Sequence, residues 1–411
     1  AVHMLAEELL GPALESRATS VELAVTRDGA ASGQTVDGIR FKRDQMTKEQ
    51  GVQLADFIKS VAGLDVEDRR RRQRGMCRVR GPAGRHDLTV TTAGSSSGLT
   101  LRIEIDREKQ LSRPFDQLGL LPSQREAFSR LWPEEERHGI VLVAAPAGQG
   151  LRTSMLSLLA RHDAYTSNIK SFEREIELEL EGVDHVRYDA ANRDADYATQ
   201  LQSILRRDPD VVQTGFVLDA ETAKVVVGPG MEGPLLYVPM RAGSVAECLQ
   251  QWVKLVGDAK AASRSLRTVS VQRLVRTLCP NCRQPYTPTA EQRAKLHLPA
   301  DKVQQLYRPG GQVLVKNKPE PCPICRGTGY LGQTGIFEVM PVDKAMRKTL
   351  GEGDLKGAYA AARRNKMMYL QEAAIQKVAS GDTSIEEVAR VTASASSGGA
   401  AKPRPAAPAP A

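Results

Sequence analysis

Apolar positions at the start of the chain follow first a helical and then an alternating spacing. Leu5, Leu9 and Leu10 recur on one face of a helix, whereas Val21–Val25 alternates apolar and polar residues as a half-buried strand does. Three further stretches predict a helix and two strands, at about Lys48–Leu64, Asp87–Thr92 and Leu99–Ile105. The pattern predicts a mixed α/β domain at this end of the chain.

The pattern changes after Gly139, where an unbroken apolar run precedes a loop of small residues. Ile140–Val143 has no polar position, which is typical of a strand buried on both faces. The loop leads into a helix expected to begin near Leu151, and this order of strand, loop and helix is typical of a nucleotide-binding unit. Val211–Thr214 and Leu235–Val238 predict further strands, so we expect a largely parallel sheet.

Proline, glycine and cysteine mark the remaining divisions of the chain. Pro and Gly between Leu111 and Pro122 indicate a linker, and the last twenty or so residues are almost entirely Ala, Pro, Ser and Gly, a composition that predicts disorder. We therefore expect an N-terminal α/β domain, a linker, an α/β core, a loop-rich cysteine segment, a helical region and a disordered tail, at residues 1–107, 108–122, 123–278, 279–341, 342–391 and 392–411.

Length and composition place the chain among multidomain globular proteins. Its 411 residues can form two or three domains with separate cores, and 26% charged with 4% aromatic residues is typical of an intracellular α/β protein. No run approaches the about 20 apolar residues of a membrane span, and no secretory signal is recognisable, so the cytosol is the expected compartment. The start at Ala1 is consistent with a processed or truncated chain.

The formal net charge of +8 has one dense source, the basic run Arg69–Arg72 with Arg74. Aromatic residues do not interleave with these arginines as a base-stacking surface would require, so we do not expect a nucleic-acid partner. We interpret the run as a basic edge that is solvated or contacts another subunit. Contact with anionic lipid or phosphate is the alternative.

Four of the six cysteines form two C-x-x-C pairs, Cys279 with Cys282 and Cys322 with Cys325. Each pair can present two thiolates to a tetrahedral ion at about 2.3 Å, and the two pairs together complete a four-sulfur shell. Disulfides, a redox pair and free buried thiols are the alternatives, but the spacing and a reducing compartment favour structural Zn²⁺. Because four sulfurs leave no open position for water, we do not expect a catalytic metal.

The loop before Leu151 lies where a phosphate-binding loop of the form G-x-x-x-x-G-K-[ST] is expected. Such a loop holds phosphates with backbone N–H groups, reaches them with the Lys and binds Mg²⁺ through the hydroxyl. Gly148 and Gly150 are present, but Ala145 replaces the first Gly, Leu151 the Lys and Arg152 the hydroxyl residue. The backbone can still attract an anion, whereas the charge clamp and the metal ligand are missing.

A shift of one residue would let Arg152 and Thr153 replace the Lys-Thr pair of such a loop. On a helix, that shift rotates the two side chains by about 100° away from the phosphates. Arg also presents its donors in a different geometry from Lys. Gly148, Gly150, Arg152 and Thr153 are therefore only weak candidates for binding a nucleotide.

Three stretches resemble motifs of the type II secretion and type IV pilus assembly ATPase family. Ser203–Val211 is similar to its LRxxLRxDPDV segment, Gln272–Cys282 to its QRLVRxLCxxC segment, and Cys322–Val339 to its second cysteine pair and following GIFE run. Their order along the chain matches as well, and the resemblance extends over nearly all of the chain except the tail.

The resemblance implies a RecA-like P-loop NTPase core with an N-terminal α/β domain, a tetracysteine zinc subdomain and C-terminal helices, assembled as a hexameric ring. It also implies ATP hydrolysis with Mg²⁺ in the cytoplasm, at the inner-membrane base of a secretion or pilus machine. Members of the family drive pilin or pseudopilin assembly through a membrane platform protein.

Catalytic positions of the family differ here. Its acidic box, E-D-P-V-E, corresponds to Glu173–Glu177, where Arg174 replaces the Asp. The end of its Walker B strand, G-E-I-R-D, corresponds to Gly215–Asp219, where Phe216 replaces the Glu that polarises water. Met240 replaces the His of its histidine box. Efficient hydrolysis is therefore not expected, whereas the cysteine pairs and the C-terminal helices are intact.

Two main hypotheses follow, with a zinc-dependent nucleic-acid-binding module as a distant third. The first is a catalytically inactive scaffold or regulatory subunit of a type II secretion or type IV pilus machine, in a homo- or hetero-oligomeric ring with an active paralogue. The second is an ATP-binding or slowly hydrolysing motor whose unorthodox site uses Arg152, Thr153, Glu173, Glu175 or Asp219.

Overall fold

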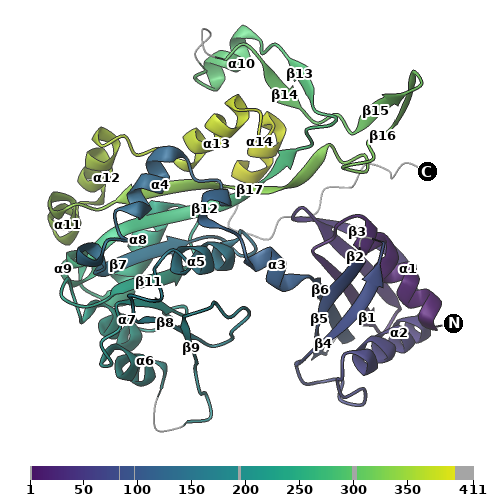
Figure 1. Cartoon of the computed structure of the whole chain (residues 1–411), viewed down its shortest axis with the longest axis horizontal. Coiled ribbons are helices and arrows are strands. Elements are labelled where there is room, and N and C mark those ends of the chain that lie inside the picture. The colour runs from purple at the N-terminus through teal and green to yellow at the C-terminus, as the bar shows by residue number, and fades with distance from the viewer. Residues whose placement is uncertain (1, 83, 97, 193–195, 299–302, 394–411) are drawn as a thin grey trace.

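Two large β-sheets organise the described residues, one in an N-terminal domain and one in a larger core, and two further sheets of two strands each lie in the cysteine segment (Figure 1). The structure is a computed structural model that describes residues 2–82, 84–96, 98–192, 196–298 and 303–393. No helix within those ranges combines the length and the apolar character that crossing a bilayer requires. The predicted disorder of the tail concerns residues that, from 394 onward, lie outside the described ranges.

The N-terminal domain is a six-stranded antiparallel sheet, ordered β3-β2-β1-β6-β5-β4, with two helices on one face (Figure 1). Its elements are α1 Val2–Glu15, β1 Ser20–Thr26, β2 Ala30–Val36, β3 Ile39–Met46, α2 Lys48–Val61, β4 Gln73–Gly81, β5 Gly84–Ser95 and β6 Gly98–Ile105. Leu23 of β1 and Leu54 of α2 are fully buried in the core between sheet and helices. Both predicted helices and all three predicted strands are confirmed, while β2, β3 and β4 were not predicted.

The core sheet has seven strands in the order β17-β12-β7-β11-β10-β8-β9, parallel except for β17. Its elements are β7 Gly139–Ala144, α5 Leu151–Leu159, β8 Ile169–Glu173, β9 Asp184–Arg187, α6 Tyr197–Leu205, β10 Val211–Thr214, α7 Ala220–Val227, β11 Leu235–Met240, α8 Val245–Val256, α9 Ala259–Arg264, β12 Leu266–Leu278 and β17 Tyr330–Pro341. Ile140 and Leu142 of β7 pack into one hydrophobic cluster and Val141 and Val143 into another. Burial on both faces explains the unbroken apolar run, and the expected parallel sheet is confirmed.

Short helices join the domain to the core. They are α3 Arg107–Leu111, η1 Phe115–Gln117, α4 Pro122–Ser129 and η2 Glu134–Glu136. The segment expected to be a linker lies along β17, because Gly335 N–H donates to Leu118 O at 2.9 Å and Arg113 Nη1 donates to Gln333 O at 3.0 Å. The linker is therefore packed against the core rather than extended in solvent.

The cysteine segment consists of short elements beside the core, and the C-terminal helices follow it (Figure 1). The segment contains β13 Gln284–Tyr286, α10 Ala290–Lys295, β14 Leu306–Arg308, β15 Gln312–Val315 and β16 Lys318–Pro321. The helices are α11 Lys344–Gly351, α12 Leu355–Arg364, α13 Leu370–Ala379 and α14 Ile385–Ala393, which confirms the expected helical region. Strand β17 comes between them and pairs with β12 over almost its whole length.

Candidate nucleotide site and metal centre

The loop between β7 and α5 has the backbone shape of a phosphate-binding loop. Gly148 and Gly150 lie in the left-handed region, with φ of 73° and 75°, which glycine adopts without strain. The loop is also fixed to β12, because Gln149 Oε1 accepts the Leu274 N–H at 2.9 Å and Gln272 Nε2 donates to Gln149 O at 2.8 Å. Helix α5 begins directly after Gly150, at the residue expected from the sequence.

Leu151 occupies the position where the phosphate-binding lysine is expected. Its side chain is 6% exposed and packs into the hydrophobic cluster that contains Phe115 and Met155. Met240, at the histidine position, is likewise buried in the cluster on the opposite face of the sheet. Two positions that would contact a nucleotide in an active enzyme therefore contribute to the packing of the core.

Arg152 pairs with the carboxylate of Glu173 in the acidic segment. Its guanidinium forms an ion pair with Glu173 and donates from Nη2 to Glu175 O at 2.5 Å. The Glu173 side chain is almost completely buried and also accepts hydrogen bonds from Ser171 Oγ at 2.5 Å and Gln213 Nε2 at 3.1 Å. Three side chains, Arg152, Ser171 and Gln213, thus donate to the carboxylate of Glu173.

Thr153 does not supply the missing hydroxyl. Its Oγ1 donates to Gln110 O of α3 at 3.5 Å, so it faces the linker rather than Glu173.

Burial lowers the pKa of the Arg152 guanidinium, and the neighbouring Glu177 opposes that shift. Because an arginine keeps its charge far above neutral pH, Arg152 remains a cation at this position.

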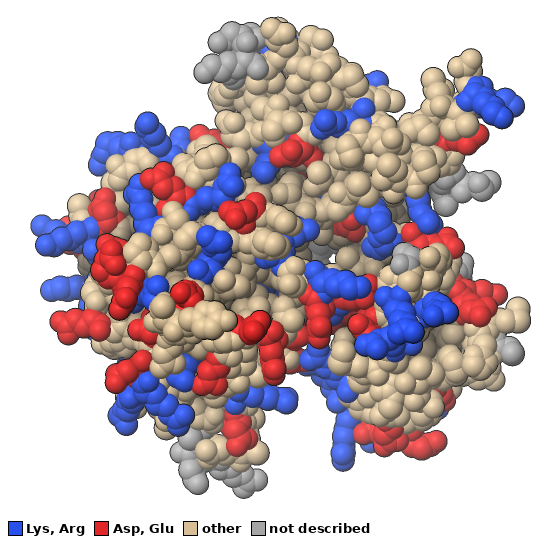
Figure 2. Space-filling model, in the orientation of Figure 1, with Lys and Arg blue, Asp and Glu red and all other residues tan. Residues whose placement is uncertain are grey.

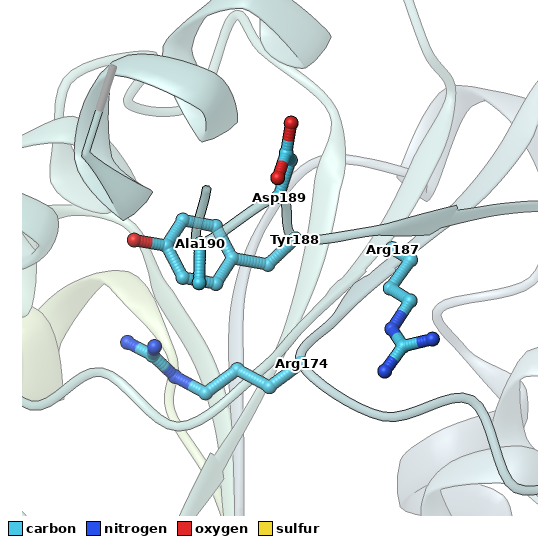
Figure 3. A pocket seen from close by; sticks show the side chains of 5 residues that line it. All are labelled: Arg174, Arg187, Tyr188, Asp189 and Ala190. Carbon is cyan, nitrogen blue, oxygen red and sulfur yellow. The ribbon is translucent and has the colours of Figure 1, made fainter. Parts of the chain in front are cut away.

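Arg174 lies at the rim of a pocket of about 520 Å³ at the carboxyl ends of β8 and β9 (Figure 3). The pocket is lined by Arg174, Arg187, Tyr188, Asp189 and Ala190. The Arg174 guanidinium lies 4.8 Å from the ring centre of Tyr188 and 4.9 Å from that of Tyr197. A cation stacked on two aromatic rings has replaced the acidic-box aspartate.

The segment after β10 carries Phe216 at the position where the resemblance implies the glutamate that polarises water. Phe216 is covered by the guanidinium of Arg241, 4.6 Å from the ring centre, and Leu218 is 68% exposed. Asp219 caps α7, since its Oδ1 accepts the Thr222 N–H at 2.7 Å. The one retained acidic residue of this segment therefore has a structural bonding partner.

Arginines from the N-terminal side complete the charge network, and the sequence did not reveal their partners. Arg74 Nη1 lies 2.8 Å from Glu175 Oε1, and Arg107 Nη2 lies 2.6 Å from Glu177 Oε2. Acidic and basic side chains gather where the domain and the core meet (Figure 2). The basic run near Arg70 and the acidic box were both visible in the sequence, but the pairs are separated by 101 and 70 residues. Only the fold brings them together.

The four paired cysteines form one buried cluster. Their sulfurs all lie within 4.8 Å of one another, with Cys279 and Cys322 4.0 Å apart and Cys282 and Cys325 3.6 Å apart. Disulfides would place the sulfurs about 2.05 Å apart, whereas four sulfurs about 2.3 Å from one ion lie about 3.8 Å from each other. The spacing fits a tetrahedral metal ion.

Donors from the surrounding loops point at the cysteine sulfurs. Each of three donors lies 3.2 Å from one sulfur. The Gly311 N–H donates to Cys282, the Gly329 N–H to Cys325, and the Asn281 Nδ2 to Cys322. Such donors stabilise thiolates, the form that binds a metal. A Cβ on Gly310 would come within 1.8 Å of Cys282 O, so the chain can pass this close only with a glycine. The cluster could hold a zinc ion.

Comparisons with known proteins agree with this geometry. The family model of type II/IV secretion system proteins matches residues 2–390. Among curated relatives, type II secretion system protein E of Dickeya dadantii is 30% identical over 388 residues, covering 94% of this chain and 75% of the relative. Type II secretion system ATPase E of Vibrio cholerae is 29% identical, with the same coverage of 94% and 75%.

Two solved structures share the fold at low sequence identity. The ATPase DotB of Legionella pneumophila matches with a TM-score of 0.62 and 16% identity, covering 95% of this chain and 96% of that one. The pilus retraction motor PilT with bound ADP matches with a TM-score of 0.55 and 17% identity, covering 93% and 95%. These likenesses show the shared architecture.

Proposed function

The chain belongs to the type II/IV secretion system protein family, and we propose that it is a catalytically inactive scaffold or regulatory subunit within it. The observation that carries this proposal is the ion pair between Arg152 and Glu173. It places a cation from the start of α5 in the expected nucleotide site and uses the acidic group that would otherwise serve Mg²⁺ or water.

Several missing groups add to this pair. Phosphoryl transfer depends on positioning and charge stabilisation, and loss of one electrostatic stabiliser can cost about 100- to 1,000-fold in rate. Leu151, Arg174, Phe216 and Met240 each replace a polar or acidic group that would contribute, and two of them are buried in the core. Their joint loss supports an inactive subunit rather than a slow motor.

We further propose that the cysteine cluster holds one structural Zn²⁺ and that the retained architecture serves assembly. The cluster, the C-terminal helices and the sheets are intact, which is the expected condition for a subunit that must fit a ring. The proposed setting is a ring with an active paralogue on the cytoplasmic side of the inner membrane, bound to the platform protein of a secretion or pilus machine.

Nucleotide binding tests the inactive-subunit proposal directly. Isothermal titration of the purified chain with Mg-ATP should give no saturable heat, and phosphate release should not exceed that of the buffer. The double variant Leu151→Lys/Arg152→Thr restores the lysine and hydroxyl of the loop and should gain measurable ATP binding. Far-ultraviolet circular dichroism serves as the folding control for the variant.

The competing hypothesis of an unorthodox motor gives the opposite results. ATP turnover by the native chain that is lost in Arg152→Ala would overturn the inactive-subunit proposal, because Arg152 would then be binding phosphate. Saturable Mg-ATP binding by the native chain would also overturn the proposal that the Arg152–Glu173 pair fills the nucleotide site. Co-purification with a paralogue that has an intact phosphate-binding loop, against a control pull-down without this chain, tests the mixed ring.

A further inference from the structure

Three arginines on the N-terminal side reach across to the acidic segment of the core. Arg74, the second residue of β4, lies 2.8 Å from Glu175, and Arg72 lies 3.5 Å from the same carboxylate. Arg107 at the start of α3 donates from Nε and Nη2 to Glu177 Oε2, at 2.9 and 2.6 Å. Two carboxylates of the core thus bind three cations of the N-terminal side.

Arg152 fixes the acidic segment in the position where these pairs form. Its Nη2 donates to the Glu175 backbone carbonyl, its Nε lies 3.5 Å from Glu177 Oε1, and the guanidinium pairs with the buried Glu173. The segment follows directly from β8, so Arg152 ties it to the start of α5. Every one of these interactions joins two protein groups, and none requires a nucleotide.

We infer that the N-terminal domain is held against the core by an ionic clamp that forms without nucleotide, made by Arg72, Arg74 and Arg107 with Glu175 and Glu177. Arg152 is the positioning residue of this clamp. The inference rests on the proposed function in one respect, because it treats the nucleotide site as filled by protein groups. A ring containing this chain would then include one subunit whose domains stay closed while active neighbours turn over ATP.

The clamp is not the only contact between the domain and the core. Gly332 N–H donates to Asp37 Oδ1 at 3.0 Å, and Arg326 pairs with Glu15 at 3.0 Å. These contacts involve β17 and the cysteine segment rather than the acidic box. Breaking the clamp should therefore let the domain swing about these contacts, not detach it.

Charge reversal at Glu175 tests the clamp, because Glu175→Arg places a third cation beside Arg72 and Arg74. Small-angle X-ray scattering on the full chain should show an increased radius of gyration. Amide hydrogen exchange in residues 72–78 and 174–178 should become severalfold faster. Roughly 1 M salt, where the Debye length falls to about 3 Å, should shift the native chain in the same direction. Saturating Mg-ATP should leave the radius of gyration and the exchange rates of the native chain unchanged.

A matched control and a rescue variant sharpen the test. Arg78 lies on the same strand as Arg74 but pairs with Asp87 inside the N-terminal domain at 2.7 Å. Arg78→Glu reverses the same charge without touching the clamp and should keep the native profile. The rescue variant exchanges the charges of residues 74 and 175 by combining Arg74→Glu with Glu175→Arg, in an Arg72→Gln background. It should restore the radius of gyration and the exchange rates of the native chain.

The outcomes separate the clamp from the proposed function. If Glu175→Arg scatters like Arg78→Glu, or if the exchanged pair fails to restore closure, the clamp is wrong whatever the nucleotide titration shows. If the native chain closes only with Mg-ATP, the clamp is also wrong. If the native chain binds ATP while closure depends on salt and on Glu175 alone, the clamp stands and the inactive-subunit proposal fails.

Discussion

At the scale of single residues, Arg152 carries the proposal for the loop between β7 and α5. A buried carboxylate such as Glu173 needs a partner, since an unpaired buried charge is costly. In this chain the partner is the guanidinium of Arg152, one position beyond the expected lysine. The substitutions at Leu151 and Met240 act differently, because they replace polar groups with core packing.

Removing Arg152 should destabilise the core more than removing both members of the pair. Arg152→Ala leaves Glu173 buried with two neutral donors, so we expect a loss of about 3 kcal/mol in the free energy of unfolding. In Arg152→Ala/Glu173→Gln much of that loss should be recovered, because no charge is buried. Urea unfolding with hydrogen exchange in β8 measures both, and a double variant no more stable than the single one would contradict the pairing.

Among the elements, the cysteine segment has two small clusters, one of its four sulfurs and one of apolar side chains that pack on α13. Its strands have three or four residues each, and the four cysteines themselves form the buried cluster at its centre. Leu314 and Val315 of β15 are 73% and 40% exposed, so they contribute little burial. The proposed Zn²⁺ would therefore order the part of the segment around β15 and β16, whereas Leu298 and Leu306 are held by packing against Val378 of α13.

Loss of one cysteine should therefore unfold this segment while the core stays folded. Native protein purified without chelator should contain about one zinc per chain by elemental analysis. Cys322→Ser should lose the metal, and hydrogen exchange should accelerate across residues 279–284 and 310–330 but not in β7 or β10. Cys77→Ser, at a lone and half-buried cysteine, is the matched control and should keep the metal. Unchanged exchange in metal-free Cys322→Ser would exclude a structural role.

Helix α14 depends on a buried carboxylate, and this makes its docking sensitive to acid. Burial by itself would raise the pKa of Glu387, but Arg390 and Arg276 together lower it to about 2. Since the pKa is below its ordinary value, the stabilisation is present above about pH 4.5 and is lost as the pH falls toward 2. The shift corresponds to a contribution on the order of 3 kcal/mol.

Hydrogen exchange of α14 as a function of pH measures this contribution, after correction for the intrinsic exchange rate. The native helix should lose protection between about pH 4.5 and 2. In Glu387→Gln it should be less protected at neutral pH and nearly independent of pH in that range. A pH profile of the variant that parallels the native one would show that another group titrates.

At the scale of the whole molecule, the segment between domain and core is part of the packed structure. Gly119 has a φ of 100° and lies so close to β17 that a Cβ would meet Thr334 Oγ1 at 2.3 Å and Gly335 O at 2.6 Å. The second of these is a backbone atom and cannot rotate away. Only glycine allows the chain to run along β17 here.

Gly119→Ala should therefore displace this segment and lower the stability of the whole chain by about 3 kcal/mol, through strain and the backbone clash. Gly63→Ala is the matched control. Gly63 also has a positive φ, of 70°, but its Cβ would meet nothing within 4 Å, so only strain of about 1 kcal/mol is expected. Differential scanning calorimetry compares the two, and equal losses would contradict close packing at Gly119.

Much of the fold was predictable because local patterns are strong where burial is strong. The apolar run of β7, the start of α5 and the C-terminal helices were read directly, since each combines a clear period with a boundary residue. Strands β2, β3 and β4 were missed. Two of them, β3 and β4, lie at the two edges of the sheet, and β4 carries Arg74, Arg78 and Arg80 on its exposed face. A polar edge strand has little hydrophobic signal to detect.

The sequence by itself determined the chemistry that is present or absent: two cysteine pairs, and a phosphate loop without its lysine and hydroxyl. These depend on residue type and short spacing, which a single chain displays. Only the tertiary structure decided which charges meet. Arg152 reaches Glu173 because the parallel strands β7 and β8 have their carboxyl ends on the same side of the sheet. Arg74 reaches Glu175 across 101 residues because the N-terminal domain packs against that side. Coulomb attraction acts over a few ångströms in space, and separation along the chain carries no information about it.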